Sequence, residues 1–332
     1  MKKTFYIILS AWACVSFLSS CNDEWKDEQF AHYVSLKAPT NASGYTVVHV
    51  KLKSSGESVS YKLPVIVSGS RTNQENLRVH IGVDPDTLAR FNLINIGVKR
   101  TDIYYKLLPE ENYSFNEVVD IPAGENVALL DIGFRLNTLD LVDKWILPLT
   151  VLDDPSYGYE SNKRKHYRKA LLKIEPFNDY SGDYSAGSCQ SYFADEAGNA
   201  DFGAQPLITQ VKRAYAVNDE EIFFYAGSID ESFAERAKYK INVKFGKNGA
   251  LTLSASDPGI NFRTIGDQTY ETEATPDATR PYLIRKYVIL TVNYFFTDKT
   301  GVVPMHYVVK GSMTLQRTLN TQIPDEDQQI EW

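Results

Sequence analysis

The sequence predicts an all-β protein of two domains, an N-terminal immunoglobulin-like antiparallel sandwich followed by an antiparallel, lipocalin-like β-barrel or a second sandwich. Apolar and polar residues alternate in many segments, which is typical of strands with one buried face. Gly, Pro, Asn and Asp separate these segments, and helical periodicity is rare. Without a 20-residue leader, 312 residues remain (332 − 20), and about 100 to 200 residues per domain then favour two domains.

The first half contains many short strands. Alternation is clearest in Thr46–Lys53 and Leu77–Val83. Further expected strands are Ser60–Val67, Val118–Ile121, Val127–Phe134, Trp145–Leu152 and Lys169–Ile174. Thr87–Ile94 is the best helical window, and Asp84-Pro85-Asp86 supplies its cap. Short strands with turn residues between them predict a sandwich, although the Cys and Trp hallmarks of antibody domains are missing.

The second half has longer strands. Lys238–Phe245 and Leu251–Ala255 flank a Gly-containing turn and predict a hairpin. Met305–Gln316 alternates over 12 residues, and Tyr287–Phe296 is its expected antiparallel neighbour. Strands of this length suit an up-and-down barrel better than a compact sandwich.

The expected organisation has four parts. Residues 1–20 are a signal peptide and 21–34 an acidic tether, the sandwich covers 35–176, and the barrel-like domain covers 177–332. The boundary falls at Glu175–Gly182, where a strand ends in Pro and turn formers precede a new β segment.

The leader has the pattern of a lipoprotein signal. Lys2 and Lys3 precede a 15-residue uncharged run, Thr4–Leu18, which is too short to cross a bilayer core of about 30 Å as a helix. Leu18-Ser19-Ser20-Cys21 matches the bacterial lipobox. We therefore expect cleavage between Ser20 and Cys21 and attachment of palmitate-type acyl chains to Cys21, which would anchor the protein firmly to a membrane.

The tether indicates a cellular location. Residues 22–28 are polar and mostly charged, as expected for a solvated segment. An acidic run after the lipidated cysteine resembles the signal that sends Bacteroidetes lipoproteins to the outer face of the outer membrane, with a plain spacer as the alternative. The expected location is the outer membrane, facing the exterior.

Charge and cysteine content limit the partners. The formal charge of −7 becomes −9 without Lys2 and Lys3 (−7 − 2), which disfavours nucleic acid. Cys189 is the only free thiol expected in the mature chain, so no disulfide forms within it. The five histidines lack metal-ligand spacing. We expect no cofactor.

Two regions resemble known domains. Leu63–Phe177 contains Leu77–Asp84, Tyr104–Pro109 and Ile121–Gly124, and it is similar to an N-terminal domain of unknown function in many Bacteroidetes surface lipoproteins. Lys310–Trp332 resembles the end of a C-terminal domain that accompanies it. Relatives are commonly encoded in polysaccharide-utilisation loci beside a TonB-dependent transporter and its glycan-capturing lipoprotein. The resemblance implies a glycan-handling role and these partners, but it assigns no binding residue.

Catalytic and metal sites have weak support. The nucleophile-elbow, HExxH, phosphate-loop and dinucleotide motifs are absent from the sequence. We therefore predict that the protein is not an enzyme. A glycosidase needs only two carboxylates brought together in space, which a sequence does not reveal. A weak Ca²⁺ candidate is the oxygen-rich loop with Asp195, Glu196, Asn199 and Asp201, for which a plain exposed loop is the alternative.

Candidate glycan contacts are aromatic. Sugars bind flat rings through their apolar C–H faces, beside polar groups that bond their hydroxyls. Tyr157 and Tyr159 lie in an expected loop, as does Tyr270, and packing of these rings against their own loops is the alternative. Thr87 in Asp86-Thr87-Leu88 resembles a Bacteroidetes O-glycosylation signal, which burial of the short helix would exclude.

The predicted function is that of a non-catalytic, lipid-anchored glycan-binding accessory whose sandwich acts as a spacer. The first alternative is a structural or adhesive subunit that pairs through exposed β-strand edges. The second alternative is a carbohydrate-active enzyme.

Overall fold

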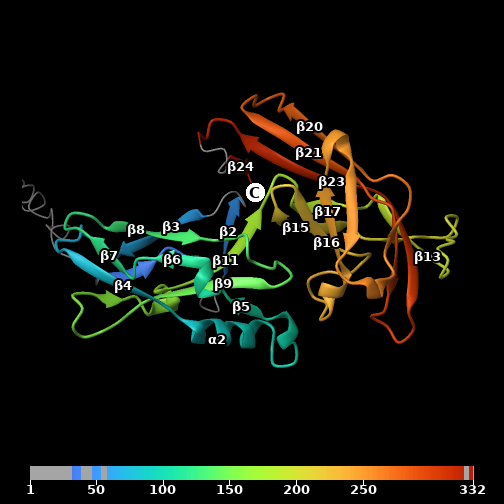
Figure 1. Ribbon diagram of the computed structural model, residues 1–332. Helices are drawn as coiled ribbons and strands as arrows, with labels where there is room; N and C mark the ends of the chain where they lie inside the picture. The colour runs from blue at the N-terminus through green and yellow to red at the C-terminus, as the bar shows by residue number, and fades with distance from the viewer. Residues whose placement is uncertain (1–31, 39–46, 54–57, 325–328, 332) are drawn as a thin grey trace, which may run out of the picture.

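The computed structural model describes residues 32–38, 47–53, 58–324 and 329–331 (Figure 1). The leader, Ser20 and Cys21 lie outside the described residues. Tyr33 and Val34, which the sequence assigned to the tether, instead begin the first strand, and Val34 is fully buried. Within the described ranges, helices long and apolar enough for a transmembrane span are absent.

The N-terminal domain is a sandwich of two sheets. One sheet has the order β10-β1-β3-β8-β6, and the other has β2-β11-β9-β4-β7 with β5 beside β9. The strands are β1 (Tyr33–Leu36), β2 (Val47–Lys53), β3 (Val59–Val67), β4 (Leu77–Val83), β5 (Tyr105–Leu107), β6 (Tyr113–Phe115), β7 (Val118–Ile121), β8 (Val127–Phe134), β9 (Lys144–Val151), β10 (Glu160–Ser161) and β11 (Lys169–Phe177).

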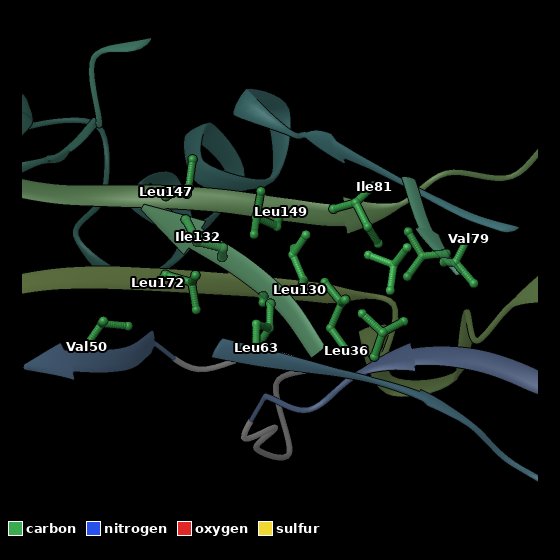
Figure 2. Packing of buried hydrophobic residues seen from close by; sticks show 14 of the residues in the cluster. Leu36, Val50, Leu63, Val79, Ile81, Leu130, Ile132, Leu147, Leu149 and Leu172 are labelled. Atoms are coloured by element: carbon green, nitrogen blue, oxygen red, sulfur yellow. The ribbon is translucent and has the colours of Figure 1, made fainter. Parts of the chain in front are cut away.

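The two sheets bury one hydrophobic core. Alternate residues of β3 and β8 face inward, and alternate buried residues of β9 and β11, such as Leu147 and Leu172, belong to the same cluster. Figure 2 shows side chains of both sheets lying together, among them Leu63, Leu130, Leu149 and Leu172. The predicted sandwich is therefore confirmed.

Three strand pairs of the sandwich are parallel, whereas the sequence predicted antiparallel pairing throughout. They are β1 with β10, β2 with β11 and β5 with β9. Alternation reports which face of a strand is buried and carries no information on the direction of its neighbour. Strand direction depends on how the connections cross between the sheets.

Helix α2 (Pro85–Asn95) occupies the predicted helical window. Asp84 caps it, because its carboxylate accepts a hydrogen bond from the Thr87 backbone N–H at 3.1 Å. Leu88 and Phe91 pack against Ile146 and Leu171 on the outer face of the β9–β11 sheet.

The C-terminal domain is a sheet curled into a half-barrel. Eight strands follow one another around it in chain order: β12 (Gly182–Ser185), β15 (Val211–Asn218), β16 (Glu221–Tyr225), β17 (Lys240–Phe245), β18 (Leu251–Ala255), β20 (Thr269–Pro276), β21 (Leu283–Thr291) and β23 (Met305–Asn320). β12 also pairs with β23. An isolated bridge between Ala250 and Thr269 is the link between β18 and β20, so the curled sheet is a half-barrel and confirms the predicted all-β fold of this domain.

Smaller elements complete the described chain. The remaining strands are β13 (Cys189–Ala194), β14 (Leu207–Ile208), β19 (Arg263–Thr264), β22 (Tyr294–Asp298) and β24 (Ile330–Glu331). The 3₁₀ turns are η2 (Thr101–Ile103), η3 (Glu110–Asn112), η4 (Arg164–His166), η5 (Arg236–Tyr239), η6 (Lys247–Gly249) and η7 (Pro258–Ile260). The barrel interior is filled by side chains such as Tyr184, Phe224, Ile241 and Leu290.

Strand β23 is longer than predicted, and its neighbour is interrupted. The expected strand Tyr287–Phe296 is divided into β21 and β22. β23 changes partner from β22 to β21 at Gly311, which has φ +129°. A Cβ on Gly311 would lie 1.9 Å from the Ser188 carbonyl oxygen. The glycine therefore permits β23 to approach the Ser188–Cys189 backbone closely.

Candidate binding cleft between the domains

A cleft of about 300 Å³ lies where the two domains meet. Figure 1 shows β11 of the sandwich reaching β15 of the barrel at this junction. Residues from both domains line the cleft, among them Lys51, Lys144, Glu175, Arg213, Tyr215 and Glu231. Ligand sites are frequently found at domain interfaces, and this volume is at the lower end of their usual range.

Glu175, near the end of β11, is the main ionic contact across the cleft. Its Oε1 lies 2.7 Å from Lys173 Nζ and 3.3 Å from Arg213 Nη2, and its Oε2 lies 3.0 Å from His49 Nδ1. Burial alone would raise the pKa of the Glu175 carboxyl, but Lys173 and His49 more than offset it. The pKa of Glu175 is therefore below its usual value, and the group stays ionised near neutral pH.

Tyr215 supplies an aromatic ring to the cleft. It stacks on Phe223 with ring centroids 4.9 Å apart, which fixes its plane. Its hydroxyl donates to Glu231 Oε2 at 3.2 Å. Burial, followed by the charge of Glu231, raises the pKa of Tyr215. The hydroxyl therefore remains protonated as a donor.

Arg236 joins the barrel to the sandwich beside the cleft. Arg236 is only 3% exposed, and its guanidinium donates to the backbone oxygens of Val142 at 2.9 Å and Asp102 at 3.4 Å. Leu141 and Val142 also pack against the hydrophobic cluster of the barrel. Polar and apolar contacts thus hold the two walls of the cleft together.

Tyr157 and Tyr159 do not form an exposed pair of rings, which corrects the hypothesis for Tyr159. Tyr159 is 9% exposed, and its hydroxyl donates to the Leu152 oxygen and accepts from the His80 N–H. Tyr157 stacks on His80 at 4.1 Å and lies 5.5 Å from Tyr159. Both rings therefore pack against the end of the sandwich.

Tyr270 also has a structural contact. Its hydroxyl donates to the Gly246 oxygen at 3.0 Å, and its ring meets Tyr180 and Phe245 edge-on. The ring remains partly exposed. The structure places it outside the residues that line the interdomain cleft.

The Asp195 loop is closed by its own hydrogen bonds. Asp195 accepts from the Asn199 backbone N–H and side-chain amide, each at 2.8 Å, and Asp201 accepts from the Gly203 N–H. Glu196 is exposed. Groups of three or more His, Cys, Asp or Glu with metal-binding geometry are absent from the part of the chain that the structure describes. The Ca²⁺ hypothesis therefore gains no support.

Thr87 is buried, so the structure contradicts the O-glycosylation hypothesis. Thr87 is 4% exposed, and its hydroxyl donates to the Asp84 carboxylate at 2.6 Å. The same hydroxyl accepts from Lys169. A glycan on this oxygen would have to displace both partners and expose the first turn of α2.

The sequence analysis missed the residues of the cleft. Lys51, Lys144, Glu175 and Arg213 come from four separate strands, and only the tertiary fold brings them together. The available signal was the expected domain boundary at Glu175–Gly182, because ligand sites favour such junctions.

Comparisons with known proteins match both halves of the chain. The family model "Domain of unknown function (DUF4973)" matches residues 25–155, and a second model, described as a C-terminal domain, matches residues 168–314. Among curated proteins, none matches.

Crystal structures from Bacteroides are similar over almost the whole chain. A protein of unknown function from Bacteroides ovatus is 46% identical with a TM-score of 0.81, covering 90% of this chain and 100% of that one. A multidomain protein including DUF1735 from the same species is 43% identical, with a TM-score of 0.78 and coverage of 90% and 100%. An auxiliary nutrient binding protein from Bacteroides thetaiotaomicron is 35% identical, with a TM-score of 0.80 and coverage of 88% and 97%.

Proposed function

Because the chain belongs to the same family as these Bacteroides proteins, we propose that it is a non-catalytic glycan-binding accessory protein of the cell surface. The interdomain cleft is the proposed binding site. One relative is an auxiliary nutrient binding protein, and saccharides are nutrients that fit the chemistry of this cleft.

The composition of the cleft is the observation that carries the proposal. Tyr215 provides a ring held by stacking, and Glu231, Arg213 and Lys144 provide charged groups beside it. A saccharide needs an apolar surface for its C–H groups and strong polar partners for its hydroxyls. The cleft supplies both, from residues of the two domains.

The state of the acidic groups supports a binding role over a catalytic one. A glycosidase needs one carboxylic acid with a raised pKa that acts as proton donor. The pKa of Glu175 is lowered instead. Asp143 forms an ion pair with Lys106 at 2.7 Å.

Membrane attachment through acylated Cys21 is part of the proposal. Tyr33 lies twelve positions after Cys21 (33 − 21), a span of at most about 40 Å when fully extended. Such a tether would hold the sandwich near the outer membrane and leave the cleft open to polymers outside the cell. A TonB-dependent transporter and its glycan-capturing lipoprotein are the proposed partners.

Affinity electrophoresis against a panel of polysaccharides tests the function. We expect retardation by at least one polysaccharide and loss of most of it in Tyr215→Ala. Tyr157→Ala, far from the cleft, is the matched control and should retain full binding. Each variant is first checked for an intact thermal transition. If no polysaccharide retards the folded protein, or if Tyr215→Ala binds as the wild type does, the proposal fails.

A structural or adhesive role remains a second candidate because of one strand edge. β18 contains no charged residue. Its outer edge makes one bridge, between Ala250 and Thr269, and one backbone hydrogen bond, from the Leu251 N–H to the Gln268 oxygen. The rest of this edge has no backbone partner among the described residues. Uncharged edges can accept a strand from another chain. By contrast, the edge strand β20 carries Glu271 and Glu273, which oppose such pairing.

A further inference from the structure

Lys144 lines the cleft without an acidic partner. It begins β9, and its Nζ lies 5.1 Å from the centroid of the Tyr105 ring. Among the described residues, Lys144 has no carboxylate oxygen within 4.0 Å.

The nearby carboxylates are already engaged by other groups. Asp143 lies 2.7 Å from Lys106 and 3.8 Å from Arg236. Glu175 is contacted by Lys173, Arg213 and His49. Glu231 accepts the Tyr215 hydroxyl. Asp183 also lies 3.8 Å from Arg213, so Asp143, Glu175 and Asp183 each face a cation other than Lys144.

Two lysines that line the cleft have lowered pKa values. Burial lowers the pKa of Lys144; Glu231 opposes the effect, and Arg236, Lys173 and Arg100 add to it. Burial also lowers the pKa of Lys51, and the charges of Glu175 and Asp183 oppose this effect. A bound anion would favour the charged form of both groups.

We propose that the cleft binds a saccharide bearing an anionic group, a carboxylate or a sulfate, and that Lys144 binds that group. This inference rests on the proposed glycan-binding function and names its substrate class. Tyr215 would contact a sugar ring while Lys144 forms a charge-assisted hydrogen bond to the anion. The small volume of the cleft favours recognition of one charged unit over a long stretch of polymer.

Isothermal titration with matched ligands tests the inference. The probes are oligogalacturonide with its methyl ester, and chondroitin sulfate oligosaccharide with its unsulfated form. We expect one charged probe to bind about tenfold or more tightly than its less charged counterpart, because a hydrogen bond to a charged group is lost. Preference for oligogalacturonide identifies a carboxylate ligand, and preference for the sulfated chondroitin over its unsulfated form identifies a sulfate.

Variants of Lys144 test whether this residue causes the preference for the charged probe. Lys144→Met should weaken binding of the charged probe about tenfold and abolish the preference over its counterpart, while Lys144→Arg should retain the preference. Lys62→Met, on the exposed outer face of β3, is the matched control and should change nothing. The comparison of ligands on the wild type stands even if Lys144→Met fails to fold.

Two results would overturn the inference in distinguishable ways. Tight binding of neutral polysaccharides at the cleft, with the charged probes no better and Lys144→Met unchanged, removes the anion preference and leaves the glycan function intact. Absence of binding to charged and neutral glycans alike removes both.

Discussion

Replacement of Glu175 by Gln should destabilise the protein by leaving cations without their partner. Gln keeps the shape of the side chain but removes the charge that faces Lys173, Arg213 and His49. The side chains of Glu175 and Lys173 are 12% and 10% exposed, whereas that of Arg213 is 41% exposed and can turn to water. Breaking a fully buried pair costs about 3 to 5 kcal/mol, so partial exposure reduces the expected loss to about 2 to 3 kcal/mol.

Urea denaturation of Glu175→Gln, Lys173→Met and the double variant measures this loss and its origin. The double variant should be less destabilised than the sum of the single ones, because removing both charges leaves neither buried alone. The reasoning is refuted if Glu175→Gln changes the free energy of unfolding by less than about 0.5 kcal/mol, the range of ordinary surface substitutions, or if the two effects simply add.

The pH dependence of the same variant provides an independent check. The pKa of Glu175 in the fold lies below its ordinary value of 4.5. Its stabilisation is therefore fully present above about pH 4.5 and is lost as the pH falls through the lower folded value. Wild type and Glu175→Gln should converge in stability as the solution is acidified through this range, and parallel curves would contradict the assignment.

Three further predictions concern other parts of the fold. Gly311→Ala should cost more than about 3 kcal/mol or prevent folding, since its Cβ would clash with the Ser188 oxygen at a positive φ; a thermal transition within a few degrees of wild type would contradict this. Asp84→Ala should destabilise by about 1 to 2 kcal/mol in urea by removing the α2 cap and the contact to Lys169, and an unchanged midpoint would refute it. Burial raises the pKa of Cys189 to about 11, so mass spectrometry of its peptide should show slow alkylation at pH 8 that becomes fast in urea; equal rates would indicate an accessible thiolate.

The sequence predicted individual strands well because burial of one face leaves a local pattern. β4 (Leu77–Val83) and β8 (Val127–Phe134) have the predicted bounds. The division between β21 and β22 was missed, because Val292 continues the apolar pattern while the break depends on Gly311 in another strand. Strand direction was missed for the same reason, since it depends on long-range topology.

The candidate site was harder to predict than the fold. An aromatic residue in a loop, such as Tyr159, looks the same in sequence whether it faces solvent or packs inward. Thr87 matched a short motif, but the ion pair between Asp84 and Lys169 that buries it joins residues 85 positions apart. Tyr215 and Lys144 lie on different domains, and no local pattern relates them.

The most direct test of the account is a crystal structure of the mature protein in complex with a saccharide that it retains in the polysaccharide panel. The account predicts electron density for a sugar in the cleft between β11 and β15, in contact with Tyr215 and with an anionic group at Lys144. A saccharide bound elsewhere, with the interdomain cleft filled only by water, would contradict it.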